Sequence, residues 1–550
     1  VIIEKKIMKH VNKYIALGML SALTVLCSCS DSWLDKSPTG SASAGEVNGN
    51  TENMKQAING ICKLMTMQHA YYGQGFNGEG TIMMMYNEYM GEDFYFPIFA
   101  PGWAPMMNGT MNNNNNSIYD AYPWYYYYTI VGNANTVLAN VDAAEGTEAE
   151  LKFLKASALT FRAFAFSQLV QFYCDSWAKS NGGSTEGIVL RIDESSDDMP
   201  LSTLAEAYDR IYTDLDEAVT LFKESGLNRS SVYGKSAVCF PDLNVAYGVY
   251  ARAALNREDY AKAQEMAALA QEGFPLMSNA DYKAGFCAPT SEWIWGSYND
   301  AAETLYYWSY QVTMAYNGYY SSIGYNIAAS RELIDAIPDT DIRKGLFLHP
   351  GTFLKEGQKV EDVIETTYGS FNLTYDANGN ITGGPAYDNY LMANEYAASV
   401  CAYPPSMTAE PYGALKFAAT GMPGIGCIPF IRSSEMLLIE AEAAYKTGNE
   451  TGAQNALNEL NASTGRDASY SCNKTGDDLW NEIVLYRRLE LWGEGHSWFD
   501  CKRWGRNVVR KTYNEGGNFH ASIAGIYGTT NSFWKWVIPA KETDYNSGIK

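Results

Sequence analysis

Residues 487–504 read RRLELWGEGHSWFDCKRW. Gly493 and Gly495 end the helix that the preceding residues predict, and a second helical turn begins after His496. Glutamates, an aspartate, a histidine and a serine stand close together here, which suggests either an active site or a structural junction. Charges packed between tryptophans are tolerated only when they are paired. A closed network of ion pairs and hydrogen bonds therefore explains the stretch better than catalysis does.

Upstream of this stretch, long helices are predicted from the spacing of apolar residues. Within 204–222 these residues recur in steps of three and four. Thr203 and Glu206 form a capping box before the run, and Gly226 ends it. Residues 151–173, rich in alanine, phenylalanine and leucine, predict another long helix.

Two further segments predict pairs of helices joined by short turns. Residues 245–255 and 260–271 form one pair, and residues 432–462 form another that turns at Gly448. The sequence NREDYAKAQEMAALAQ (256–271) resembles the second helix of a tetratricopeptide unit. We therefore expect a mainly α fold: a tetratricopeptide-like scaffold of helical pairs with long irregular loop inserts and a few short β-hairpins.

Three inserts interrupt the helices. Residues 97–117 are rich in proline, glycine and asparagine, residues 273–330 interleave aromatic residues with glycine and serine, and residues 345–430 carry turn signals. In the last of these, DANGN at 376–380 predicts a hairpin. Long loops in a compact protein are usually functional, so we expect the ligand site in the inserts.

The N-terminus predicts export and lipid attachment. Two lysines precede an apolar run over 15–26, and the small Ser28 stands before Cys29. This is the pattern of a signal peptide, ending in what resembles a bacterial lipobox, whose cysteine is acylated. The apolar run is shorter than the roughly 20 residues that a membrane-spanning helix needs. We expect residues 1–28 to be a lipoprotein signal peptide and residues 29–550 to be a single domain tethered through lipid on Cys29.

The composition narrows the class of ligand. The 550 residues carry 40 Lys and Arg against 62 Asp and Glu, a formal net charge of −22. The excess of acidic residues argues against a nucleic-acid-binding protein, which needs a basic surface. It also disfavours strongly anionic polysaccharides as ligands. The 41 tyrosines, 21 phenylalanines and 13 tryptophans suit a protein that offers flat apolar faces to polar ligands.

Other sequence motifs lack the structural context that their usual function requires. GQGFNG at 73–78 matches a dinucleotide fingerprint, but it lacks the strand and βαβ unit that this motif requires. The histidines beyond the signal show no helical i, i+4 pair, so we expect no zinc site and name no metal-ligating residue. Two carboxylates facing a sugar bond, as in a glycoside hydrolase, stay possible because sequence spacing cannot identify them. The cysteines after Cys29 form no Cys-x-x-Cys pair, and we expect buried free thiols.

The stretch at 487–504 resembles the C-terminal signature of the SusD/RagB family, an Arg-x-Glu-Leu, Glu-Gly, Trp-Phe-Asp, Arg-Trp series. CSDSWLDKSP (29–38) resembles the segment after that family's lipidated cysteine, and WVIPAKETDYN (536–546) resembles its closing segment. The long helices and helix pairs follow in family order. The resemblance thus covers nearly the whole chain after the signal, and the inserts are where the sequence departs from it.

The resemblance implies a non-catalytic lipoprotein exposed on the surface of the cell outer membrane. Such a protein would cap a SusC-like TonB-dependent transporter, bind a glycan and deliver oligosaccharides for import, without a cofactor. A peptide-binding lid of the same type of transporter, a structural lipoprotein without ligand and an α-helical glycoside hydrolase remain alternatives. The sequence specifies neither the glycan nor a bound calcium ion.

A glycan site needs aromatic faces for C–H patches and polar groups for hydroxyls. The insert at 97–117 supplies both and occupies a region that contributes to the family's glycan site, so Trp103 and Asn108 are the first candidates. The further candidates are Trp293, Trp295, Tyr319, Tyr320 and Tyr325 in the second insert, and then Tyr71 and Tyr72. We expect the tyrosines of 124–135 to pack in the core, and the asparagine run at 112–116 can equally be a loop tip without fixed structure.

Overall fold

The computed structural model describes residues 49–69, 71–73, 75–97, 100–234, 238–297, 305, 308–358, 373–407 and 409–549. The predicted signal peptide over 1–28 and the predicted acylation site, Cys29, lie outside the described residues. Helices dominate the described ranges, and the strands there are short pairs.

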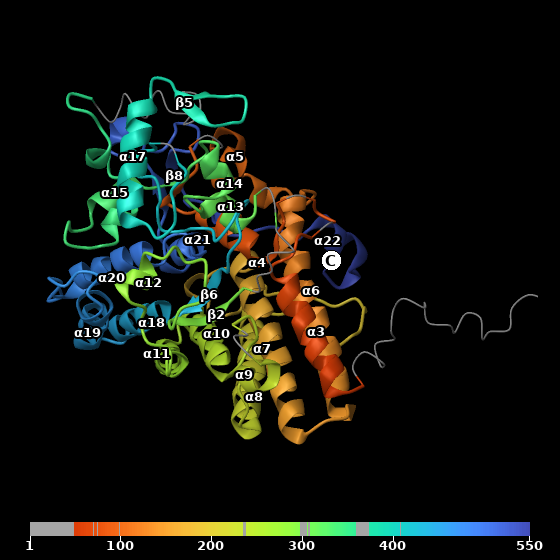
Figure 1. The fold of residues 1–550 in the computed structure, drawn as a ribbon. Coiled ribbons are helices and arrows are strands. Elements are labelled where there is room, and N and C mark those ends of the chain that lie inside the picture. The colour runs from red at the N-terminus through yellow and green to blue at the C-terminus, as the bar shows by residue number, and fades with distance from the viewer. Residues whose placement is uncertain are drawn as a thin grey trace, which may run out of the picture.

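Four long helices form one half of the scaffold and run side by side in the lower part of Figure 1. They are α3 (Thr51–Leu64), α6 (Ile118–Asn140), α7 (Glu148–Tyr173) and α8 (Leu204–Ser225). α7 packs along both α6 and α8, and its residues are buried on nearly all sides, as an apolar helix requires. The predicted ends of α8 are confirmed: Thr203 and Glu206 cap its start, and Gly226 ends it in the left-handed conformation.

Paired helices form the other half of the scaffold. The pairs are α10 (Leu243–Asn256) with α11 (Tyr260–Ala270), and α18 (Ser433–Lys446) with α19 (Glu450–Asn458). α11 packs on α18, and α18 also packs on α20 (Gly476–Glu490). Stacking buries faces that one pair alone leaves open. The two predicted helix pairs and the mainly α fold are confirmed.

Short helices and paired strands fill the segments between the long helices, most of them above the scaffold in Figure 1. The helices are α4 (Gly78–Thr81), α5 (Ala100–Met107), α9 (Arg229–Tyr233), α12 (Asn279–Tyr282), α13 (Tyr310–Met314), α14 (Tyr319–Ser322), α15 (Arg331–Asp335), α17 (Tyr387–Val400), α21 (Ser497–Trp504) and α22 (Ala540–Tyr545). The antiparallel strand pairs are β1 (Phe94–Tyr95) with β3 (Ala328–Ala329), β2 (Trp293–Gly296) with β6 (Pro429–Arg432), β4 (Thr374–Tyr375) with β5 (Ile381–Gly383), and β7 (Val508–Arg510) with β8 (Gly525–Tyr527). The hairpin predicted at 376–380 is confirmed as the turn between β4 and β5.

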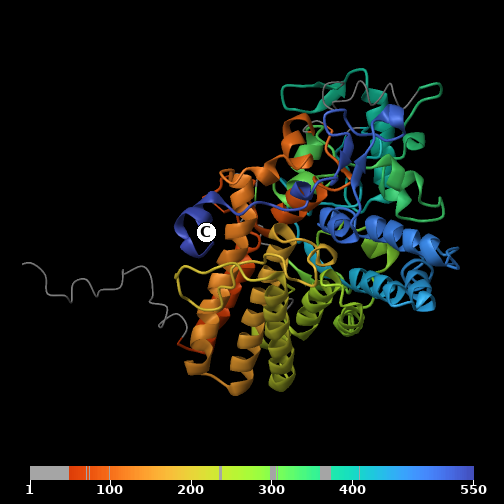
Figure 2. The ribbon, with the colours of Figure 1, turned by 180° about the vertical axis from the view of Figure 1, so that it is seen from behind.

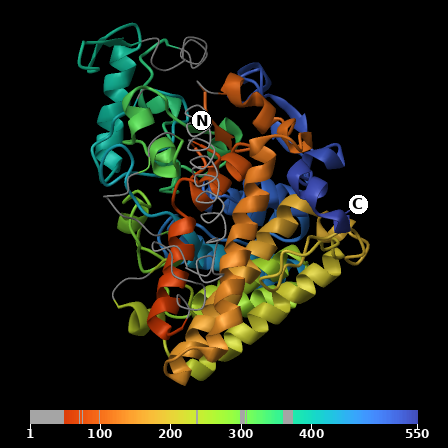
Figure 3. The ribbon, with the colours of Figure 1, turned by 90° about the vertical axis from the view of Figure 1, so that its right-hand side faces the viewer.

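The segment between α7 and α8 crosses the outer face of α6, as Figure 2 shows from behind. The Tyr128 hydroxyl on α6 donates a hydrogen bond to the Val189 carbonyl at 2.7 Å. The end of the chain packs against the same segment, because Asn546 exchanges hydrogen bonds with the Met199 backbone at 3.0 and 2.9 Å. These contacts hold α22 beside α6 (Figure 3).

The interior is one continuous apolar core with two smaller clusters beside it. The eight described cysteines are free thiols, six of them buried, while Cys401 and Cys427 are partly buried. Among the described helices, none combines the length and the apolar character that crossing a membrane requires.

Candidate functional site

The stretch at 487–504 forms the junction between α20 and α21. Glu490 lies at its centre and is fully buried. Its carboxylate oxygens lie 2.9 Å from Arg343, 3.2 Å from Arg432 and 3.4 Å from Arg466. Burial alone raises the pKa of a carboxyl group, but these arginines hold the pKa of Glu490 well below its ordinary value. The carboxylate therefore stays ionised inside the core.

The other acids of the junction are paired in the same way. Glu494 lies 2.6 Å from the Lys416 ammonium, and Asp500 lies 2.6 Å from the Arg487 guanidinium. Burial opposes ionisation of both acids, yet the cationic partners lower both pKa values. Burial and the surrounding arginines lower the pKa of His496, which is therefore neutral. The charged side chains of the stretch therefore pair with one another, as expected of the structural junction that the sequence predicted.

The junction also joins distant parts of the chain. Arg488 lies 2.8 Å from Asp93 and 3.1 Å from Glu92. Arg510 donates hydrogen bonds to the carbonyls of Gly91 and Met107 at 2.8 and 3.0 Å. These contacts fix the segment before α5 against the C-terminal motif.

A cavity of about 40 Å³ lies beside the junction, between Arg252, Glu435 and His496. This volume holds one or two water molecules. Small-molecule sites usually measure roughly 300–1,000 Å³. The cavity is therefore part of the charged junction and too small for a sugar.

Aromatic side chains from the inserts gather above the long helices. Trp103, on α5, meets Trp308 edge-to-face with ring centroids 5.5 Å apart. Tyr320 lies 5.2 Å from Trp308, 5.9 Å from Tyr319 and 6.2 Å from Tyr325. Four of the five residues are at least partly exposed, whereas Tyr320 is buried. We call these five residues the aromatic platform.

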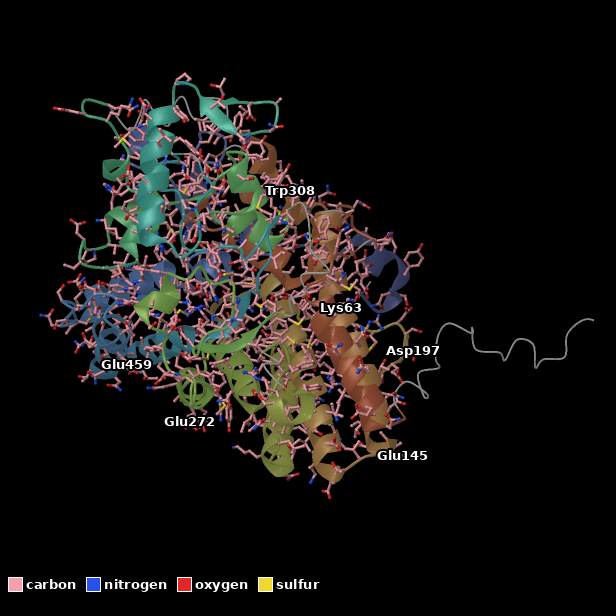
Figure 4. The ribbon with its side chains drawn as sticks, viewed as in Figure 1. Lys63, Glu145, Asp197, Glu272, Trp308 and Glu459 are labelled. Atoms are coloured by element: carbon pink, nitrogen blue, oxygen red, sulfur yellow. The ribbon has the colours of Figure 1, made fainter. Side chains whose placement is uncertain are left out.

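Trp308 is the platform residue that the sequence did not single out, because it is one of many aromatic residues in the 273–330 insert. Figure 4 labels it among the loops above the long helices. Its φ of 56° is rare for a bulky residue and persists only where the surroundings impose it. Gly75 packs closely against Trp308, since a Cβ atom added at position 75 would lie 3.2 Å from the Trp308 Cβ. The glycine loop at 73–78 therefore packs against an aromatic ring.

Two predicted tryptophans do not reach the surface, and the side chain of a predicted asparagine contacts the protein itself. Trp293 and Trp295 are 2% and 0% exposed, because β2 lies inside the core between helices and pairs with β6. The Trp295 indole donates a hydrogen bond inward, to the Cys239 carbonyl at 2.9 Å. Asn108 donates to the Ser522 carbonyl at 3.2 Å, and its amide oxygen is buried. The two tryptophans therefore present no face to a ligand, whereas Asn108 is partly exposed.

A second concave surface lies between the loop after α3, the helix α6 and the helix α22. Its volume is about 700 Å³. Its walls include Tyr71, Tyr72, Tyr125, Tyr126, Tyr545 and Lys541. Tyr71 and Tyr545 form an exposed rim, at 74% and 84% exposure, and Tyr126 is a buried floor. We call this surface the tyrosine hollow; it contains the predicted pair Tyr71 and Tyr72.

The polar groups of the hollow are placed by contacts within it. The Lys541 ammonium donates a hydrogen bond to the Tyr71 hydroxyl and lies 5.1 Å above the ring of the same tyrosine. Burial and the nearby Glu542 carboxylate raise the pKa of Tyr125 to about 12, so this hydroxyl keeps its proton at neutral pH. Glu542 itself accepts a hydrogen bond from the Trp124 indole at 3.3 Å.

The asparagine run at 112–116 has a fixed structure and supports α22. The Asn112 carbonyl accepts a hydrogen bond from the Val537 amide at 3.0 Å, and the Asn115 carbonyl accepts one from Ala540 at 2.8 Å. The Asn112 side chain donates to the Phe533 carbonyl at 2.9 Å. The first insert therefore carries a platform residue and also holds one wall of the hollow.

Within the described ranges, no group of three or more histidine, cysteine or acidic side chains is arranged to hold a metal ion. The stacked helix pairs with aromatic inserts define a helical-repeat protein of the tetratricopeptide-like class. A family model described as "SusD family" matches residues 417–548, and one described as "Starch-binding associating with outer membrane" matches residues 33–239. These two matches and a SusD-like relative support the SusD/RagB family that the sequence motifs indicated.

Relatives are distant in sequence and similar in length. A SusD-like protein P2 from Formosa agariphila is 23% identical over 502 residues, which cover 88% of each chain. A crystal structure of a SusD-like carbohydrate binding protein from Bacteroides vulgatus is 22% identical, with a TM-score of 0.65 over 91% of this chain and 97% of the other. A SusD superfamily protein from Bacteroides thetaiotaomicron is 21% identical, with a TM-score of 0.65 over 91% and 99%. At such identities the structures establish a shared fold.

Proposed function

We propose that this protein is a cell-surface lipoprotein that binds a glycan and caps a SusC-like TonB-dependent transporter, to which it delivers oligosaccharides for import. The proposal includes no catalytic step and no cofactor. The match to a family model described as "Starch-binding associating with outer membrane" supports the binding of carbohydrate at the outer membrane. The acids of the C-terminal motif support a role without catalysis, because cationic side chains engage them in the core.

The observation that carries the proposal is the contact between Trp103 and Trp308 on the aromatic platform. The two indoles come from different inserts and meet 5.5 Å apart, and both residues are partly exposed. Aromatic faces of this kind cover the C–H patches of a sugar ring. Tyr319 and Tyr325 add hydroxyl groups that can donate to and accept from sugar hydroxyls.

The binding step is tested by native gel electrophoresis through gels that contain amylopectin, laminarin, galactomannan, xyloglucan or polygalacturonate. Wild type is compared with Trp103→Ala and Trp308→Ala, and Trp480→Ala is the control because its ring is also partly exposed but lies on α20. We expect one neutral polysaccharide to retard wild type and the control but neither platform variant. Equal retardation of all four proteins would place the site elsewhere, and retardation by none would favour peptide capture or a structural lid.

The transporter step is tested separately by affinity purification of the tagged protein from detergent-solubilised outer membranes. We expect a TonB-dependent barrel protein to co-purify in a fixed ratio. Recovery of the lipoprotein alone, under conditions in which known membrane complexes survive, would contradict the capping role and leave the binding step intact.

A further inference from the structure

Partly exposed rings connect the tyrosine hollow with the aromatic platform. Tyr72 lies 5.6 Å from Phe76, Phe76 lies 5.5 Å from Tyr119, and Tyr119 lies 5.8 Å from Trp103. Phe76 is buried, whereas the other three rings reach the surface. The spacing along this row is nearly constant, and three of its four residues reach the surface between the platform and the hollow.

The chemistry of the hollow suits an uncharged, hydroxyl-rich ligand. Its aromatic walls are tyrosines, which combine an apolar face with a hydroxyl that donates and accepts. The lining carries one positive charge, on Lys541, and one negative charge, on Glu542. Thr129, exposed on α6, adds another hydroxyl. A strongly anionic ligand finds no excess of positive charge among these groups.

The hollow has the size of a small-molecule binding site. Its volume of about 700 Å³ falls within the roughly 300–1,000 Å³ of small-molecule sites. Its described walls come from helices and one loop, so they offer no strand edge to which a peptide could add a strand. The loop at 71–78 borders both surfaces, because Tyr71 lines the hollow and Gly75 packs against Trp308.

We propose that the tyrosine hollow is a second binding site for the same uncharged glycan, so that one long chain lies across the platform and ends in the hollow. This inference rests on the proposed function, since it assumes that the platform binds a glycan. It adds a preference for long chains, because short fragments occupy one surface and longer ones occupy both.

The test compares a trisaccharide and an octasaccharide cut from the polysaccharide that retards wild type, each titrated by isothermal calorimetry. The variants are Tyr71→Ala and Tyr545→Ala in the hollow and Trp308→Ala on the platform. Tyr387→Ala is the matched control, because Tyr387 is partly exposed on α17, outside both surfaces. Tyr545→Phe, which keeps the ring, separates stacking from hydrogen bonding. Thermal unfolding of each variant checks that the fold is retained.

We expect wild type to bind the octasaccharide more tightly than the trisaccharide. Each hollow variant should weaken octasaccharide binding about tenfold and leave trisaccharide binding unchanged, whereas Trp308→Ala should weaken both. If wild type binds but the hollow variants match the Tyr387→Ala control at both lengths, the second site is refuted and the proposed function stands. If no polysaccharide retards wild type, both the second site and the proposed function are refuted. Retention of a peptide digest that depends on Tyr71 and Tyr545 would instead assign the hollow to peptides.

Discussion

Glu490 is the residue on which most of the junction's positive charge converges. Glu490→Gln keeps the shape of the side chain but leaves Arg343, Arg432 and Arg466 without their shared carboxylate. Removing one member of a buried ion network costs about 3–5 kcal/mol, so the urea midpoint should fall strongly. The control is Glu148→Gln, in an exposed pair with Lys152, which should leave the midpoint nearly unchanged. Equal effects of the two substitutions would show that the network contributes little.

Asp120 is a buried acid whose side-chain oxygens accept no hydrogen bond from the described residues. Burial raises its pKa from 3.8 to about 8, so between these values the folded chain keeps a proton that the unfolded chain has lost. Rising pH across this window therefore favours unfolding. Asp120→Asn removes this pH dependence. As the pH rises across the window, the free energy of unfolding of the variant should therefore increase relative to that of wild type by up to about 1.4 kcal/mol per pH unit. Urea unfolding at both ends of the window measures this gain, and a constant difference would contradict the raised pKa.

Single residues show where the sequence could not predict the site. Trp103 and Trp295 have the same chemistry and both follow loop signals, yet one lies on α5 at the surface and the other in a buried strand. Burial depends on what packs against a residue from far along the chain, and no local pattern contains that information. The structural role of Glu490 could be predicted, because charges buried next to tryptophans are tolerated only when they are paired.

At the scale of elements, the helices were predictable because their signals are local. Periodicity, a capping box and a terminal glycine lie within one helix, and α8 shows all three. The asparagine run at 112–116 had no such signal. Its order comes from backbone contacts with residues near 537, more than four hundred positions away, which sequence composition does not reveal.

The glycine loop offers a test at the same scale. Gly73 and Gly75 have similar positive φ values of 90° and 93°, so alanine strains the backbone equally at both positions. A Cβ at Gly73 meets open space, whereas one at Gly75 meets Trp308. We expect Gly75→Ala to displace the indole and reduce polysaccharide retardation, while Gly73→Ala keeps it. Equal retardation of both variants would mean that the loop does not set the position of Trp308.

At the scale of the whole molecule, the predicted lipid anchor can be separated from the fold. Cys29→Ser should move the protein from the membrane fraction to the soluble fraction, because the acylated thiol is lost. Cys27→Ser is the matched control, since Cys27 follows a bulky leucine, and it should stay with the membrane. Fractionation with and without detergent measures both, and protease treatment of intact cells reports surface exposure. A Cys29→Ser protein that remains in the membrane would refute the anchor.

The pairing of Arg488 with Asp93, across 395 positions, also has a consequence in time. A chain that is synthesised from its N-terminus presents its early acids long before their arginine partners emerge. Until then these acids stay hydrated, and the segment around them cannot be buried. The last large step of folding therefore waits for residues 488–510. A chain cut short before that point keeps an open, hydrated region around Asp93.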